Sequence, residues 1–182
     1  MTKRIEEYQT TAGLWTQSKS EAIRVTHEQL LTVVHGFGTT IRDSYWLGTA
    51  DHETNCALNE RDTEISGFQS WGVYQVSRAE ARAMRAPEAN LLALVGNTLV
   101  MIRLAERART VLRMACNLIF PDDPDPPDLP GYLAIAHNLG LFGHGGALES
   151  VVLHGLDYDE FERRNPTLRV VTSGYGRSCI GS

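Results

Sequence analysis

The stretch EANLLALVGNTLVMIRLAERARTVLRMACNLIF, residues 88–120, decides the fold class of the chain. Its apolar residues recur at the spacing of a helix over about 30 positions, and Gly96 is the one interruption. Pro87 stands where the first turn of such a helix should begin. We therefore predict a long central core helix, with Gly96 as the place where it could break.

Five prolines follow in PDDPDPPDLPG, residues 121–131. Proline lacks an amide hydrogen and clashes with the preceding turn, so this segment is predicted to be an extended or turning connector. The next stretch, residues 132–146, is too short to fold alone, and we expect it to pack back onto the core. The apolar LRVV, residues 168–171, indicates a strand near the C-terminal end.

Shorter helices are predicted on the N-terminal side of the long one. Two capping boxes, THEQ at residues 26–29 and SRAE at residues 77–80, each mark a helix start, and the first of these helices should end at Gly36 or Gly38. A further helix is expected between them, beginning after Thr39.

That further helix should run to about Asn55 and be followed by a polar loop over residues 56–71. The whole pattern predicts a mainly α fold with a long central helix and a small loop or hairpin region after the helix that ends near Asn55. We expect residues 1–25 to form an N-terminal arm and residues 26–182 to form a single domain.

Composition narrows the classes of partner. The chain has 182 residues and a formal net charge of −5, which argues against a nonspecific nucleic-acid binder because phosphate contacts need a surplus of Lys and Arg. No apolar run reaches the roughly 18 residues that a membrane span needs, and MTKRIEEYQTT lacks the apolar core of a signal peptide. An excised leader would fit equally well, so the compartment stays open.

The three cysteines, Cys56, Cys116 and Cys179, are widely spaced and odd in number. This spacing fits neither a zinc knuckle nor a disulfide framework, and we expect buried or free thiols, with one disulfide plus one free thiol as the alternative. No cofactor is predicted. His144 and His154 lie near acidic residues, but without the spacing of a metal-binding helix, so no metal site is predicted.

The segment TADHETN, residues 49–55, places acidic side chains at the predicted end of a helix, where the dipole disfavours negative charge. At about 100° per residue, Glu53 shares a stripe with Trp46, whereas Asp51 points to nearly the opposite side, so the two carboxylates do not form a dyad. If Trp46 desolvates Glu53, its pKa rises and it can donate a proton. A solvated residue at a frayed helix end is the alternative.

A loop rich in glycine and aromatic residues follows at SGFQSWGVYQVS, residues 66–77. Its glycines permit positive φ, and Phe68, Trp71 and Tyr74 offer flat apolar faces of the kind on which sugar rings stack. The loop therefore suits a polysaccharide groove, and a β-hairpin with exposed aromatic side chains is the alternative.

Four motifs in order then resemble the lysozyme-like superfamily, in particular soluble lytic transglycosylases and goose-type lysozymes. These families carry a catalytic Glu at a helix end in an E-S-x-x-N context, then a G-L-M-Q-I type loop, a following helix, and an A-Y-N-A-G type segment. HETN at residues 52–55, WGVYQVS at 71–77, PEANLLALVGNTL at 87–99 and IAHNLG at 135–140 are similar to them in that order. The resemblance spans about residues 40–141.

The departures fall at functional positions. Thr54 stands where the family usually has Ser, Val73 and Tyr74 replace Leu and Met of the loop, and His137 replaces the Tyr that helps to orient the catalytic Glu. A neutral imidazole could hydrogen-bond a carboxyl group in its place. A polar group satisfied inside the fold is the alternative for His137.

The resemblance implies cleavage of a β-1,4 bond in a glycan such as peptidoglycan, with Glu53 protonating the glycosidic oxygen. A hydrolase also needs a second carboxylate, for which Glu64 and then Asp62 are favoured. If neither faces the groove, a lytic transglycosylase is implied. A chitosanase or chitinase and a noncatalytic glycan-binding module are the alternatives. The residues expected to contact substrate are Phe68, Trp71, Tyr74, Gln75, His137 and Asn138.

Overall fold

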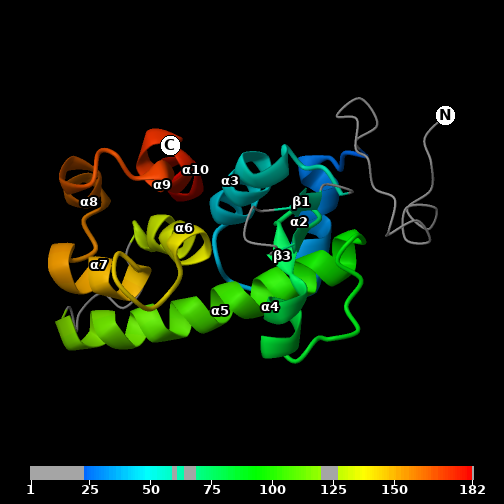
Figure 1. Cartoon of the computed structure of the whole chain (residues 1–182), viewed down its shortest axis with the longest axis horizontal. Coiled ribbons are helices and arrows are strands. Elements are labelled where there is room, and N and C mark those ends of the chain that lie inside the picture. Colours follow the sequence, from blue (N-terminus) through cyan, green and yellow to red (C-terminus); the bar gives the residue numbers. More distant parts are fainter. Residues whose placement is uncertain (1–22, 59–60, 64–68, 120–126, 182) are drawn as a thin grey trace. The chain divides into compact units, whose positions relative to one another are not determined.

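The part of the chain that the computed structural model describes is mostly helical (Figure 1). The predicted mainly α class is therefore confirmed. None of the helices within this part is long and apolar enough to cross a membrane. The described residues are 23–58, 61–63, 69–119 and 127–181.

These residues form two compact units. The first unit holds residues 23–39 and 50–104, and the second holds residues 40–49 and 105–181. Two helices contribute residues to both units, α3 (Asp43–Thr54) and α5 (Leu94–Ile119). With 26 residues, α5 is the long helix that its apolar spacing predicts.

The first unit combines short helices with a small antiparallel sheet in the order β1-β2-β3, so a small β region follows the end of α3 as expected. Its complete elements, besides the parts of α3 and α5, are α2 (His27–Gly36), β1 (Arg61–Thr63), β2 (Gln69–Trp71), β3 (Val76–Ser77) and α4 (Arg78–Ala83).

Both predicted capping boxes are present. The Thr26 hydroxyl accepts a hydrogen bond from the Gln29 amide at 3.2 Å, and the Gln29 side chain accepts one from the Thr26 amide at 3.0 Å. Ser77 and Glu80 make the same reciprocal pair at the start of α4. Two otherwise unpaired amide groups are satisfied at each helix start, which explains why these boundaries could be predicted locally.

The start of α5 differs from the prediction. Pro87 does not open the helix but lies in a turn, in which the Ala89 amide donates to the Ala86 carbonyl, and α5 begins at Leu94. Gly96 does not break the helix either. A Cβ at Gly96 would lie 2.3 Å from the Asn90 carbonyl oxygen, so this glycine leaves room for the incoming chain to pass.

The segment just before α2 pairs with the segment just after α3. Arg24 forms an antiparallel bridge with Ala57, the Val25 amide donates to the Cys56 carbonyl at 3.0 Å, and the Leu58 amide donates to the Ile23 carbonyl at 2.8 Å. These main-chain bonds fasten the N-terminal side of the first unit to the end of α3.

The described part of the second unit contains helices joined by turns, and no strand. Its C-terminal helices, besides the parts of α3 and α5, are α6 (Leu129–Leu139), α7 (Ala147–His154), α8 (Tyr158–Arg164), α9 (Arg169–Thr172) and α10 (Tyr175–Ile180). The connector predicted for residues 121–131 is shorter than expected at its C-terminal end, because Pro130 lies in the first turn of α6. Proline is tolerated there since the first amides of a helix have no partner within it. Residues 120–126 lie outside the described part.

Aromatic side chains form the core of the second unit. Tyr132 and Tyr158 are fully buried with ring centroids 5.9 Å apart at an edge-on angle, and Phe161 lies 5.4 Å from Tyr158. Glycines admit the Tyr158 ring: a Cβ at Gly131 would lie 2.7 Å from it, and one at Gly176 would lie 1.6 Å from its hydroxyl oxygen. The helices α6, α8 and α10 therefore approach one another around a single tyrosine.

The N-terminal half of α3 packs against α10 within the same unit. The Ser44 hydroxyl donates to the Cys179 carbonyl at 2.8 Å, and a Cβ at Gly48 would lie 2.9 Å from the Cys179 amide nitrogen. Cys179, like Cys56 and Cys116, is buried and forms no disulfide with another described residue, as expected.

The strand predicted for residues 168–171 is wrong. Arg169–Thr172 is the short helix α9, with Val170 buried and the Ser173 amide donating to the Arg169 carbonyl at 3.0 Å. Two adjacent β-branched residues favour a strand, but no described strand pairs with this segment. The segment forms a helix instead and buries the Val170 side chain.

Candidate functional site

Glu53 lies in the last turn of α3 and its side chain is partly exposed. The helix ends abruptly after Thr54, because Asn55 and Cys56 have φ values of 51° and 59°, both in the left-handed region. The Cys56 amide then donates to the Ala50 carbonyl at 3.1 Å. Glu53 is therefore the last residue but one of α3.

A guanidinium group offsets the negative charge at this helix end. Nη1 of Arg24 donates to the Thr54 carbonyl at 3.3 Å and also to the Asn55 carbonyl. Carbonyl groups in the last turn of a helix lack partners within it, and a cation there interacts favourably with the helix dipole. Arg24 therefore explains how α3 tolerates the acidic cluster that the sequence places at its end.

Thr54 joins the end of α3 to the loop that carries the second motif. Its hydroxyl donates to the Val73 carbonyl at 3.0 Å and accepts from the Ala57 amide at 3.1 Å, and the side chain is buried. A hydroxyl at this position therefore bridges two segments, a role that either Thr or Ser can fill.

Asn97 on α5 holds the same loop from a third segment. Its side-chain amide donates to the Trp71 carbonyl at 2.7 Å and to the Leu91 carbonyl at 2.9 Å, and its side-chain oxygen accepts from the Tyr74 amide at 2.9 Å. Asn97 is fully buried, so these three bonds form away from solvent. Gly72, with φ of 70°, makes the close approach possible, because a Cβ there would lie 2.4 Å from the Asn97 amide nitrogen.

Asn97 lies in the motif at residues 87–99, but no sequence pattern singles out its side chain as a link to the loop. Its partners are up to 26 positions away along the chain. A buried asparagine between apolar helical positions is the only hint that sequence could offer, because a buried amide needs partners.

The aromatic and polar residues predicted to bind substrate in the first unit have different environments. Tyr74 is fully buried, which corrects its predicted role, since a side chain without exposed surface cannot stack on a sugar. Trp71 is partly exposed. Gln75 is also partly exposed, has φ of 49°, and donates from Nε2 to the Gly72 carbonyl at 2.9 Å.

The other predicted site residues are divided between the units or lie outside the described part. Asp62 lies on β1 opposite Ser70 of β2, and its side chain is outside the described part. Phe68 and Glu64 lie outside the described residues altogether. His137 and Asn138 lie in the last turn of α6, in the second unit, and both are partly exposed.

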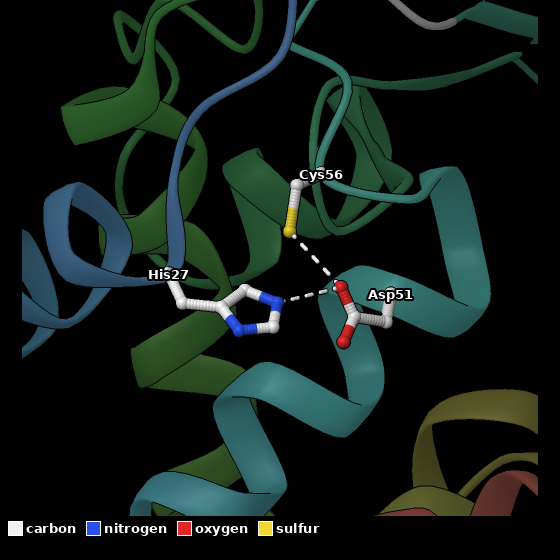
Figure 2. A group of neighbouring side chains, drawn as sticks. All are labelled: His27, Asp51 and Cys56. Carbon is white, nitrogen blue, oxygen red and sulfur yellow. Dashed lines mark hydrogen bonds and ion pairs between the residues drawn. The ribbon is translucent and has the colours of Figure 1, made fainter.

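The sequence did not predict a cluster of His27, Asp51 and Cys56 near the end of α3 (Figure 2). One carboxylate oxygen of Asp51 lies 2.9 Å from Nε2 of His27 and accepts a hydrogen bond from the Cys56 thiol at 3.2 Å. Cys56 is buried, whereas the side chains of His27 and Asp51 are 53% and 46% exposed. Within the described ranges, these are the three residues whose potential ligand atoms lie close enough together to hold a metal ion.

The cluster is not a nucleophilic triad. Burial, followed by the hydrogen bond to Asp51 and the charge of that carboxylate, raises the pKa of the Cys56 thiol to about 12. The carboxylate stands between the thiol and the imidazole, so the imidazole is not the group that would take the thiol proton. Cys56 is therefore a protonated hydrogen-bond donor at neutral pH.

No protein family, curated protein or solved structure matches the chain.

Proposed function

We propose that the chain cleaves β-1,4-glycosidic bonds in a glycan of the peptidoglycan type, with Glu53 as the general acid. The observation that carries the proposal is the hydrogen-bonded link between the end of α3 and the 71–75 loop. Thr54 binds Val73, and Asn97 binds both Trp71 and Tyr74. Three of the four motifs that resemble lysozyme-like enzymes, at residues 52–55, 71–77 and 87–99, are thus joined by hydrogen bonds in one compact unit.

Glu53 has the placement that a general acid needs. Its carboxyl group is partly exposed and stands on the last turn of a helix whose end is fixed by Arg24 and Thr54. A carboxyl group on such a helix end can deliver its proton to the leaving glycosidic oxygen as an oxocarbenium-like transition state forms. The Trp71 side chain, partly exposed on the neighbouring loop, supports the proposal as an apolar face for a sugar ring.

The group that attacks from the far side of the sugar determines the product. A carboxylate from Asp62 or Glu64 would activate water or form a covalent intermediate and give hydrolysis. Without such a carboxylate, a hydroxyl group of the substrate itself would attack, which gives an anhydro end and makes the enzyme a lytic transglycosylase.

The test is mass spectrometry of purified peptidoglycan after incubation with wild type, Glu53→Gln and Glu88→Gln. Glu88 is an exposed carboxylate of the same unit and serves as the matched control. We expect Glu53→Gln to lose roughly 10²- to 10⁴-fold in rate, the usual contribution of a general acid, and Glu88→Gln to match wild type. Equal rates for wild type and Glu53→Gln would contradict the proposal.

The products distinguish the alternatives. Reducing-end muropeptides indicate a hydrolase, and anhydro-muropeptides indicate a transglycosylase. If peptidoglycan gives no product, soluble chitosan is the next substrate, because the formal net charge of −5 favours a cationic polymer. Glycan binding without turnover of either polymer would assign the chain to the noncatalytic binding modules.

A further inference from the structure

We propose that His27, Asp51 and Cys56 form a Zn²⁺ site that fastens the start of α2 to the end of α3. The sequence predicted no metal site, and this site does not depend on the proposed glycan cleavage. Figure 2 shows the three side chains converging from separate segments. The imidazole nitrogen, the carboxylate oxygen and the thiol sulfur all lie within 4.8 Å of one another.

The distances suit tetrahedral zinc. Zinc binds His nitrogen and carboxylate oxygen at about 2.0–2.2 Å and Cys sulfur at about 2.3 Å, so tetrahedral ligand atoms stand about 3.3–3.6 Å apart. The Asp51 oxygen is 2.9 Å from the His27 nitrogen and 3.2 Å from the Cys56 sulfur. An ion at the centre therefore requires the Asp51 oxygen to move a few tenths of an ångström away from each of these two atoms, which themselves lie within 4.8 Å of each other.

Main-chain hydrogen bonds bring the three ligand residues close together. The Cys56 carbonyl accepts a hydrogen bond from the Val25 amide at 3.0 Å, and the Cys56 amide donates to the Ala50 carbonyl at 3.1 Å. Val25 lies two residues before His27 and Ala50 lies directly before Asp51, so both bonds bring Cys56 close to the other two ligands. His27 is the first residue of α2, directly after the Thr26 cap. Because the backbone is already arranged, ion binding needs to order only the side chains, which favours affinity.

The donor set selects the ion by chemistry. A thiolate is a soft ligand and disfavours Mg²⁺ and Ca²⁺, which prefer oxygen, whereas nitrogen, oxygen and sulfur together suit zinc. When zinc binds, the Zn–S bond replaces the S–H bond and the proton leaves to solvent. The resulting thiolate and carboxylate balance the two charges of the ion. Arg24, which binds the nearby Thr54 and Asn55 carbonyls, is the cation that opposes binding.

The fourth position belongs to water. His27 and Asp51 are about half exposed, so the site opens to solvent on their side, while Cys56 closes it on the buried side. Three protein ligands and one water complete a tetrahedral shell.

The test uses the full chain without a histidine tag, stripped with a chelator and titrated with ZnCl₂ in competition with a chromogenic chelator. The variants are His27→Gln, Cys56→Ser and, as the matched control, His35→Gln, which changes another exposed histidine of α2. We expect one zinc per chain and a loss of affinity of at least about 100-fold in His27→Gln, since even residues that only support ligands contribute 10- to 100-fold. His35→Gln should bind as wild type does.

Cobalt substitution gives a second readout that does not depend on stability. Wild type with Co²⁺ should show a thiolate-to-cobalt charge-transfer band, and Cys56→Ser should lack it. Absence of the band in wild type, or equal zinc affinity in wild type and His27→Gln, would overturn the proposal. Since His27→Gln alters an exposed side chain, its fold is expected to persist, and circular dichroism verifies this.

Discussion

Replacing Asn97 by alanine should destabilise the first unit more than any surface change could. The substitution removes three hydrogen bonds at once, to the Trp71 carbonyl, the Leu91 carbonyl and the Tyr74 amide. A hydrogen bond contributes about 0.5–1.5 kcal/mol and a buried polar group left without its partner costs about 1–3 kcal/mol, so about 1–2 kcal/mol per bond is a central value. At 1–2 kcal/mol for each bond, the free energy of unfolding should fall by about 3–6 kcal/mol. A chain of this size loses about 2–4 °C in Tm per kcal/mol, so Tm should fall by about 6–24 °C.

The neighbouring residue provides the control. Thr98 is also fully buried on α5, but in the described part of the chain its hydroxyl has no hydrogen-bond partner. Thr98→Val removes that hydroxyl at nearly constant volume, and the free energy of unfolding should stay within about 1 kcal/mol of wild type or rise. The pair therefore compares a satisfied and an unsatisfied polar group at adjacent core positions.

Thermal unfolding followed by circular dichroism measures the magnitude, and hydrogen exchange of the Tyr74 amide tests the cause. That amide donates directly to Asn97 Oδ1, so its protection should fall in Asn97→Ala and persist in Thr98→Val. A fall in Tm of less than about 2–4 °C, equivalent to about 1 kcal/mol, would refute the argument. Unchanged protection of the Tyr74 amide in Asn97→Ala would do the same.

Two further predictions concern the buried tyrosines of the second unit. Tyr158→Phe should leave the free energy of unfolding unchanged or raise it by up to about 1 kcal/mol, because the buried Tyr158 hydroxyl has no partner among the described residues. Tyr132→Phe should lower the free energy of unfolding by about 0.5–1.5 kcal/mol, because it loses the 3.2 Å hydrogen bond to the Asp157 carbonyl. Urea unfolding measures both, and a greater loss for Tyr158→Phe would contradict this order. Burial raises the pKa of Tyr132 and Tyr158 in the folded chain, so their contribution to stability is fully present below the unfolded value of about 10 and is lost as pH rises further. Tyrosinate absorbance during an alkaline titration should show both rings ionising only with unfolding, and ionisation of both rings in the folded chain would disprove it.

The sequence predicted those parts of the fold that depend on neighbouring residues. The capping boxes at Thr26 and Ser77 fix helix starts through groups three positions apart, and the long apolar period of α5 is visible in any short window. The predictions for Pro87 and for residues 168–171 were wrong for the converse reason. Their conformations depend on turns and packing partners that a local window does not contain.

The candidate site divides in the same way. Glu53 could be placed at a helix end from its own segment, and Gly72 could be expected to adopt positive φ, as it does. The contacts of Asp51 could not be predicted, because His27 is 24 positions away and no sequence rule pairs them. Nor could the burial of Tyr74, since an aromatic side chain in a glycine-rich loop suits a core as well as a sugar-binding surface.

The packing of α3 against α10 has a consequence for synthesis on the ribosome. Ser44 binds the carbonyl of Cys179, which lies 135 residues further along the chain. While those residues are being made, the N-terminal half of α3 lacks the Ser178 and Cys179 backbone that packs beside Gly48. Arg24, in contrast, can pair with Ala57 as soon as a short further stretch has been translated. The end of α3 that carries Glu53 can therefore acquire its native partners early, and the beginning of the same helix must wait for the second unit to close.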